Sequence, residues 1–428
     1  MPSFSNNCCR KAALRIELSA LRYAVQCIFL FARRHAKRMN PKPLATIRRL
    51  VIVNQAANYL TIGFANAFNR RFESVTLIAG SVHVQGESLA PDIKVRHINR
   101  WHERPALRKA VSFAGALARM WWLLMTRYRG HEVLFVSVPP MGYLLNLVLP
   151  HRFSMVIWDI YPDTLKITGM RDSHPLYRAW AWLNRRSFRK AHRIFTISEV
   201  MADALAVYVR RERLLIQPIW AMFQGGERIA REENPFLRDQ AVGGRFVVQY
   251  SGNIGVTHNV ELLIDVAERL KGDTRILFQI IGRGPREPAI RRRVEQAGLA
   301  NVQMLPFQSD DMFPYSLSAA DLGVVVLDAR VAQGSVPSKA YNLMSMGVPS
   351  LYVAPPESQL ARDAERFGHA RCIDAANIDE IVRWIEHLAS RPPELDQMAE
   401  NARAAAARFS RANADRFADL YFEPDHEP

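Results

Sequence analysis

Cysteine is scarce in this chain, and the spacings that mark a metal or disulfide site are missing. Four of the 428 residues are cysteines, and three of them lie close to the N-terminus. This usage suits a reducing compartment and excludes a disulfide framework. Histidines are scattered, and no Ser/His/Asp or Cys/His arrangement stands out. Hydrolytic chemistry through a side-chain nucleophile is therefore not indicated.

Long apolar runs are also missing. The most apolar early stretch, residues 21–32, is 12 residues long and contains Arg22, whereas a spanning helix needs about 20 apolar residues. A basic run follows it in place of a small-residue cleavage site, so it is not a clean signal peptide. Residues 1–45 form a basic N-terminal extension that either lies on a membrane surface as an amphipathic helix or is disordered. Translation that starts at Met39 is a third possibility.

Positive charge is concentrated in the first half of the chain. Residues 1–220 carry 34 Lys and Arg against 12 Asp and Glu, a net charge of +22, and the remainder carries 23 against 29, a net charge of −6. A basic half indicates contact with nucleic acid or with an anionic membrane. The acidic second half argues against a nucleic-acid groove that would cover the whole protein.

Short apolar runs alternate with helical stretches from about residue 48, which is typical of parallel sheets covered on both faces. We expect strands at 50–53, 75–79, 133–138, 155–158, 193–197, 246–251, 277–281, 302–305, 322–327 and 350–353. A polar stretch at 223–245 is interpreted as the interdomain linker. The predicted fold class is α/β, with doubly wound Rossmann-like domains at 46–222 and 246–421, the last helix of which can pack back on the first domain. Such sheets bind ligands at the carboxyl ends of their strands, so two facing sheets create a cleft.

Two predicted helices of the first domain are rich in tryptophan and arginine. One covers residues 107–128 and the other residues 176–192. Each is either an ordinary core-facing helix or a helix that docks on a membrane with its basic residues toward the headgroups.

The segment from Gly334 to Pro349 is the most informative. Ser335 can cap a helix, and Gly347 ends it before the next strand. A helix N-terminus at the sheet's carboxyl edge, with Lys339 in its first turn, is a good site for a diphosphate. The alternative is an ordinary capped helix with a solvated lysine.

Glycine turns follow two other strands of the second domain. They are residues 250–255 and residues 281–285, and the second contains Arg283. Neither is a dinucleotide fingerprint or a P-loop. Together with Lys339 they predict an anion-binding rim along three strand ends.

The order and spacing of six short segments resemble one family. The segments are residues 137–140, 159–163, 191–198, 250–255, 281–285 and 337–349. They are similar to segments of the GT-B glycosyltransferases of family 4, especially the bacterial members that build cell-surface polysaccharides on polyprenyl-diphosphate lipids. The resemblance implies the GT-B fold, in which two domains face each other across a cleft. It also implies a retaining transfer from a nucleotide-sugar donor without a metal or other cofactor, and the absence of an Asp-x-Asp motif agrees with this.

Catalytic roles are assigned to Lys339, which would stabilise the leaving diphosphate, and to Asp159, which would orient or deprotonate the acceptor. Asp159 could instead cap the turn that ends at Asp163. The family often carries two glutamates eight positions apart, where this chain has Gly334 and Asn342. The predicted donor-binding residues are Asn253, Gly255, Gly282, Arg283, Ser335, Ser338, Lys339, Tyr341 and Asn342. The residues predicted on the acceptor side, which could also form only a tight turn, are Ser137, Pro139 and Pro140.

The expected partners are a nucleotide-sugar, a lipid-linked or other saccharide acceptor, and an anionic membrane surface reached through the basic first domain. We expect no nucleic acid partner and a cytoplasmic location at the inner face of the plasma membrane. Three alternatives remain open: a nucleotide-sugar epimerase, a non-catalytic subunit that binds the nucleotide-sugar, and a nucleic-acid-binding protein.

Overall fold

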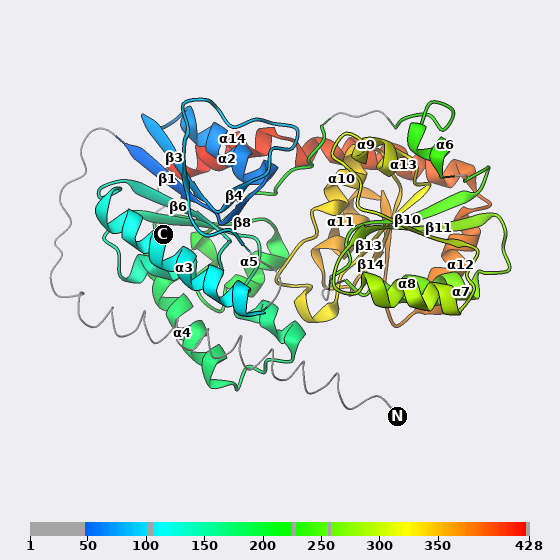
Figure 1. Cartoon of the computed structure of the whole chain (residues 1–428), viewed down its shortest axis with the longest axis horizontal. Helices are drawn as coiled ribbons and strands as arrows, with labels where there is room; N and C mark the ends of the chain where they lie inside the picture. The colour runs from blue at the N-terminus through cyan, green and yellow to red at the C-terminus, as the bar shows by residue number, and fades with distance from the viewer. Residues whose placement is uncertain (1–47, 102–105, 225–227, 241, 256–257, 425–428) are drawn as a thin grey trace.

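The chain forms two α/β domains that lie side by side (Figure 1). The computed structural model describes residues 48–101, 106–224, 228–240, 242–255 and 258–424. The extension predicted at residues 1–45 lies outside the described residues. The predicted fold class, two doubly wound Rossmann-like domains, is confirmed.

The first domain is built on seven parallel strands in the order β5-β3-β1-β6-β7-β8-β9. Its central strands are almost wholly buried, as expected for apolar runs covered on both faces. The strands are β1 (Arg49–Val53), β3 (Ser74–Ala79), β5 (Lys94–His97), β6 (Glu132–Val136), β7 (Phe153–Ile157), β8 (Ile194–Thr196) and β9 (Leu214–Ile216), beside a small pair of β2 (Ala56–Ala57) and β4 (Ser81–Val82). The helices are α2 (Tyr59–Asn69), α3 (Ala106–Thr126), α4 (Pro175–Lys190) and α5 (Glu199–Leu205), with 3-10 turns η1 (Gly142–Leu147), η2 (Asp163–Thr168) and η3 (Arg211–Arg213).

The second domain repeats the plan with six parallel strands in the order β12-β11-β10-β13-β14-β15. The strands are β10 (Phe246–Asn253), β11 (Ile276–Arg283), β12 (Val302–Leu305), β13 (Leu322–Val326), β14 (Ser350–Val353) and β15 (Ala370–Ile373). The helices are α6 (Pro235–Asp239), α7 (Glu261–Arg269), α8 (Glu287–Gln296), α9 (Phe313–Ser318), α10 (Lys339–Ser345), α11 (Gln359–Phe367), α12 (Ile378–Leu388) and α13 (Pro392–Ala406), with turns η4 (Ala329–Val331) and η5 (Ala407–Phe409).

All ten predicted strands are confirmed, with ends that shift by one or two residues. Five strands were missed: the two-residue pair β2 and β4, and the three strands β5, β9 and β15 of the main sheets. Each of the latter three lies at the edge of a sheet, where pairing on one side leaves its residues half exposed. Their sequences therefore lack the continuous apolar run that identifies the central strands.

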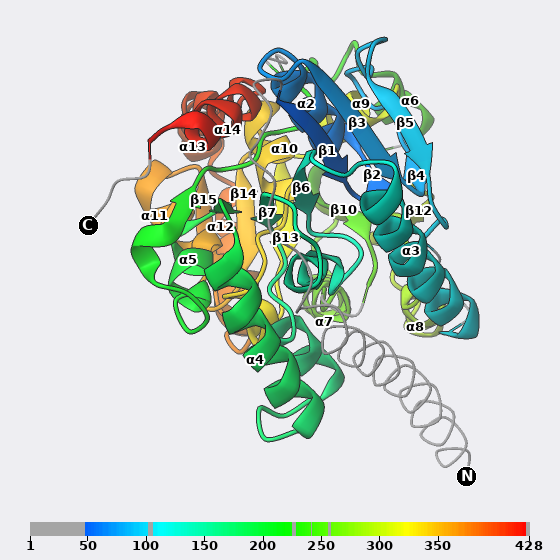
Figure 2. The same ribbon diagram turned by 90° about the vertical axis from the view of Figure 1, so that its left-hand side faces the viewer.

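The C-terminal helix α14 (Ala412–Phe422) returns to the first domain and packs against α2 (Figure 2). The ring of Phe417 meets that of Phe64 edge to face, with 4.8 Å between centroids. The hydroxyl of Tyr421 donates to the buried carboxylate of Glu132 at 2.6 Å, and Arg48 pairs with the same carboxylate at 2.6 Å. Desolvation acts to raise the pKa of Glu132, but these two partners outweigh it and hold the pKa below its usual value.

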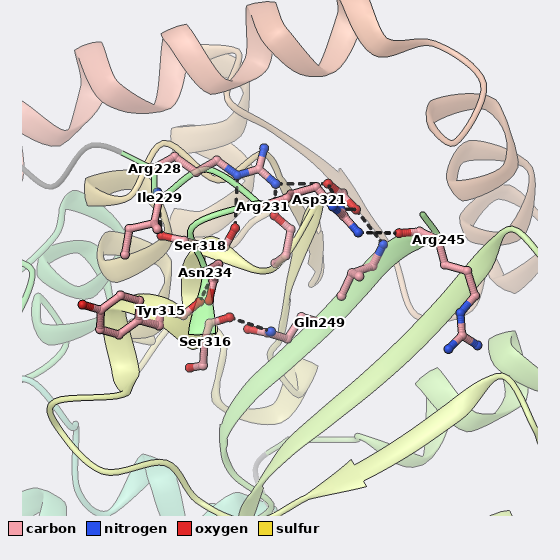
Figure 3. Close-up of polar contacts among 12 residues, drawn as sticks. Arg228, Ile229, Arg231, Asn234, Arg245, Gln249, Tyr315, Ser316, Ser318 and Asp321 are labelled. Atoms are coloured by element: carbon pink, nitrogen blue, oxygen red, sulfur yellow. Dashed lines mark hydrogen bonds and ion pairs between the residues drawn. The ribbon is translucent and has the colours of Figure 1, made fainter. Parts of the chain in front are cut away.

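Residues 228–240 form ion pairs and hydrogen bonds with the second domain, so the linker is shorter than the predicted range 223–245. Figure 3 shows the polar contacts that hold this segment. The carboxylate of Asp321 pairs with Arg228 at 3.1 Å and with Arg231 at 2.8 Å, and also accepts the Val247 amide at 2.8 Å. The Asn234 amide donates to the Tyr315 carbonyl at 2.8 Å. These contacts were not readable from composition, because a polar stretch looks the same whether its side chains meet solvent or a neighbouring helix.

Replacing Asp321 by alanine is expected to lower the free energy of unfolding by about 3 kcal/mol. The substitution leaves two partly buried guanidinium groups and a strand amide without their acceptor. Asp379→Ala is the matched control, because that carboxylate is 75% exposed and its pair with Arg269 should contribute less than 1 kcal/mol. Urea denaturation followed by fluorescence measures both, and equal losses would contradict the anchoring role.

Candidate active site

A cavity of about 410 Å³ opens between the two domains, at the carboxyl ends of the second sheet's strands. Its wall is formed by both domains and by the segment after β9, residues 217–224, which crosses from the first domain toward the second and is called the crossing segment. The first domain and the crossing segment supply Gln85, Asp159, Thr164 and Met222. The second domain supplies Ser251, Gly252, Asn253, His258, Phe307, Gln308, Asp310, Phe313, Leu327, Val331, Ser335, Pro337, Ser338, Lys339 and Asn342.

The two domains also contact each other directly, through residues at this cavity. Asp159 and Ser335 form an antiparallel bridge, and the Ile160 amide donates to the Gly334 carbonyl at 3.1 Å. At another point the Gln85 amide donates to Asp310 at 2.9 Å. This contact uses only the backbone carbonyl of Gly334, which any residue would supply, so it does not explain the glycine at this position.

Lys339 is the cation that faces the cavity from the second domain. Its Nζ donates to the Tyr250 hydroxyl at 2.8 Å and lies 4.1 Å from the centroid of that ring. Within the described ranges no carboxylate forms an ion pair with it, and burial lowers its pKa to about 7. A buried ammonium without a counter-charge favours an anionic ligand, which would restore the charged form.

The helix that carries Lys339 is shorter than predicted. Helix α10 begins at Lys339 after Ser338, and the Ser338 side chain makes no capping hydrogen bond. Ser335 does not cap this helix, because its backbone pairs with Asp159 across the interface. Both serines still line the cavity, where they can meet a ligand directly.

Asp159 faces the cavity from the end of β7. Burial raises the pKa of its carboxyl to about 6, and the hydrogen bond with the Ser335 side chain opposes this only in part. Asp159 and Lys339 line the same cavity. Asp163, in contrast, accepts hydrogen bonds from the hydroxyls of Tyr177 at 2.6 Å and Tyr208 at 2.5 Å, so its role is structural.

The glycine turns supply fewer ligand contacts than predicted. Asn253 lines the cavity, but Gly255 and Gly282 do not. Gly282 pairs with Gly252 in the sheet and has a φ of +153°, and a Cβ there would lie 1.9 Å from the Gly252 carbonyl oxygen. This glycine is needed for the close approach of two strands rather than for a donor.

Arg283 reaches the cavity only indirectly. Its guanidinium lies 4.9 Å from the centroid of the Phe307 ring, and Phe307 lines the cavity with 47% of its surface exposed. Arg283 itself does not line the cavity, so the predicted direct contact with a diphosphate is not supported by the geometry.

Of the neighbouring residues on α10, Tyr341 is misassigned. Its ring is 1% exposed and stacks on Phe409 at 4.2 Å between centroids, so it belongs to the core. Asn342 does line the cavity, and its side-chain oxygen accepts the Met222 amide at 2.8 Å. It therefore links the donor-side helix to the segment that crosses between the domains.

Ser137, Pro139 and Pro140, predicted on the acceptor side, do not line the cavity. The Ser137 hydroxyl donates to the Val156 carbonyl at 3.1 Å and accepts the Trp158 amide at 3.0 Å, so it is fully used within the sheet. The alternative of a tight turn is the correct one here.

Sequence reasoning missed several wall residues, among them Gln85, Phe307 and Asp310. Phe307 follows the end of β12, so the rule that ligands bind at carboxyl strand ends could have identified it. Gln85 gives no such signal, because it reaches the cavity from a loop after the short strand β4.

Within the described ranges, no three His, Cys, Asp or Glu side chains come together as a metal site would need, and independence from metal stays a prediction. Over the same residues, none of the helices has both the length and the apolar character needed to cross a membrane.

Comparison with known proteins identifies both domains. Residues 61–220 match the family model described as "Glycosyl transferase 4-like domain", and residues 234–405 match "Glycosyl transferases group 1". WcaI of Escherichia coli (strain K12), named for glycosyl transfer in colanic acid biosynthesis, is 28% identical over 212 residues, which are 49% of this chain and 52% of WcaI. The chain spans about half the length of the curated relatives it matches.

Solved structures agree on the fold. WaaG, described as a glycosyltransferase involved in lipopolysaccharide biosynthesis, superposes with a TM-score of 0.67 at 13% identity, over 88% of this chain and 100% of that one. Anabaena HepE, solved with UDP-glucose, gives a TM-score of 0.64 at 14% identity, over 87% and 98%. The two family models together match most of the described residues, and the chain belongs to the GT-B glycosyltransferases of family 4.

Proposed function

We propose that this protein transfers a sugar from a nucleotide-diphosphate sugar, bound mainly by the second domain, to a saccharide acceptor in the synthesis of a surface polysaccharide. One observation supports this most: the Lys339 ammonium, which pairs with no carboxylate among the described residues, and the Asp159 carboxyl, whose pKa is raised, line the same interdomain cavity. The structural neighbour HepE was solved with UDP-glucose, which agrees with a donor of this class.

On the donor side, departure of the nucleoside diphosphate develops negative charge on its phosphate oxygens. Lys339 would neutralise that charge, and Asn253, Ser335 and Ser338 would donate hydrogen bonds to the same group. Donors that are already in place in a cavity between domains stabilise such charge more than bulk water does.

On the acceptor side, Asp159 would orient the attacking hydroxyl and take its proton. In a retaining transfer without an enzyme nucleophile, the acceptor attacks from the face that the leaving group vacates. Asp159 and Lys339 line the same cavity, so a hydroxyl held by Asp159 can lie near the departing diphosphate. No metal has a part in this scheme.

The proposal is tested by incubating the protein with UDP-, GDP-, dTDP- and ADP-sugars and a polyprenyl-diphosphate-linked saccharide extract. Release of nucleoside diphosphate that depends on the acceptor and persists in EDTA is the expected result, with the anomeric configuration retained in the product. Binding of a nucleotide-sugar without any transfer would instead favour the non-catalytic subunit, because Gly334 has no side chain where the family often has a glutamate. Interconversion of free nucleotide-sugars would favour the epimerase.

The acceptor is proposed to be lipid-linked, and the protein to work at the inner, anionic face of the plasma membrane. Helix α4 exposes Arg185, Arg186 and Arg189, and its Trp182 lies 3.8 Å from the Arg186 guanidinium. Lys190, on the same helix, donates to the carbonyls of Asn146 and Leu149 instead.

Changing these three arginines of α4 to glutamine should weaken sedimentation with phosphatidylglycerol vesicles by about a hundredfold. Each basic residue near an anionic surface contributes about 1 kcal/mol. The control removes the same charge from the second domain, as Arg292→Gln, Arg383→Gln and Arg391→Gln, and should sediment like the wild type. If both triple variants lost binding equally, overall charge rather than α4 would be responsible, and equal binding to neutral vesicles would contradict the electrostatic account.

A further inference from the structure

Tyr250 is a buried residue of strand β10 and directly precedes three residues of the cavity wall, 251–253. Its side chain has no exposed surface, yet its hydroxyl makes two hydrogen bonds. It accepts from the Lys339 ammonium at 2.8 Å and donates to the carbonyl of Asn253 at 2.7 Å. The hydroxyl therefore connects the cation of α10 to the turn that ends β10.

The neighbouring backbone is shaped to allow this contact. Gly252 has a φ of +144°, and a Cβ at that position would lie 3.1 Å from the Lys339 Nζ. The ring of Tyr250 also lies under the ammonium, 4.1 Å from it, where a cation and an aromatic face attract each other. Lysine has a long flexible side chain whose ordering costs up to about 2 kcal/mol, so such contacts hold it ready before a ligand arrives.

We propose that Tyr250 is a positioning residue for the donor's diphosphate: its hydroxyl fixes the Lys339 ammonium relative to the turn at Gly252 and Asn253, so that both meet the phosphate oxygens together. This inference rests on the proposed function, and it assigns a role to a residue that does not line the cavity itself. It acts through Lys339, which does line it.

The test is Tyr250→Phe, which keeps the ring and removes the hydroxyl. Binding is measured by calorimetry with whichever of UDP, GDP, dTDP or ADP the wild type binds most tightly. The variant should bind about tenfold more weakly, since a hydrogen bond to a charged group is lost. Tyr352→Phe is the matched control: Tyr352 is equally buried, on β14, and its hydroxyl meets His369 at 2.7 Å away from the cavity wall. The control should bind like the wild type.

Two further readouts separate positioning from general stability. In a background of Lys339→Met, Tyr250→Phe should cost no more than about twofold, because its effect passes through the lysine. The affinity of the wild type should fall as pH rises past the pKa of Lys339, and loss of the acceptor should move that fall to lower pH. The other titratable groups on the wall, Asp159, His258 and Asp310, are the same in both proteins.

The outcomes distinguish this inference from the proposed function. If the wild type binds none of the four diphosphates, the proposed function fails. If the wild type binds one of them and Tyr250→Phe binds it equally well with the same pH dependence, only the positioning role is wrong. A Tyr250→Phe variant whose effect stays tenfold without Lys339 would also overturn the positioning role.

Discussion

Replacing Lys339 by methionine is expected to lower the turnover of sugar transfer by about 10²–10³-fold. Methionine keeps most of the side chain's length and apolar surface but supplies no charge to the departing diphosphate. Among the described residues that line the cavity, Lys339 is the only lysine or arginine, so no neighbour replaces it there. Arg283 contacts the Phe307 ring and does not line the cavity.

The control for this substitution is Lys271→Met, which removes the same charge from an exposed position after α7. It should leave turnover and nucleotide affinity unchanged. Turnover is measured as nucleoside diphosphate released at saturating acceptor, and affinity by calorimetry. If Lys339→Met behaved like Lys271→Met, the ammonium would have no part in donor binding, and its contact with Tyr250 would be structural only.

Replacing Asp159 by asparagine should lower kcat by about 10²–10⁴-fold while donor affinity changes little. Asparagine is close in shape and can still bond with Ser335, so the interface at the cavity should persist, but it cannot accept a proton. Asp396→Asn, at an exposed position on α13, is the control and should be as active as the wild type. Equal loss of donor affinity and turnover in Asp159→Asn would show instead that the carboxylate holds the domains together.

The pH dependence of kcat/KM should be bell-shaped and narrow. Activity should rise as pH passes about 6, because Asp159 must lose its proton to act as a base, and burial has raised its pKa to that value. Activity should fall above about 7, where unliganded Lys339 loses its charge. Asp159→Asn should abolish the rise on the acid side and Lys339→Met the fall on the alkaline side. Profiles that keep both limbs in both variants would assign them to other groups.

The sequence predicted the central strands well because buried parallel strands are continuous apolar runs, as in β1 and β13. It predicted wall residues that lie at strand ends, such as Asn253 at the end of β10. It also predicted wall residues in and just before α10, among them Lys339. Tyr341 was misassigned because the direction of a side chain on a short helix depends on what packs against it, here Phe409 from the returning C-terminal segment.

Contacts between segments far apart in the chain could not be predicted in this way. The bridge between Asp159 and Ser335 joins two domains, and no local pattern encodes it. The same holds for Tyr250, which looks like one more buried residue of an apolar strand until the structure places Lys339 beside its hydroxyl. Local sequence patterns indicated where the site lies, and tertiary packing decided which side chains compose it.

The measurement that most directly tests the central claim is a thermal unfolding screen of the wild-type protein with UDP-, GDP-, dTDP- and ADP-sugars. A ligand present at 100 times its dissociation constant should add about 2.7 kcal/mol to the free energy of unfolding. If the interdomain cavity binds the donor, one nucleotide class stabilises the protein in this way and Lys339→Met loses the effect. Stabilisation by none of the four, with the wild type folded and monodisperse, would contradict the assignment of the interdomain cavity as a nucleotide-sugar site.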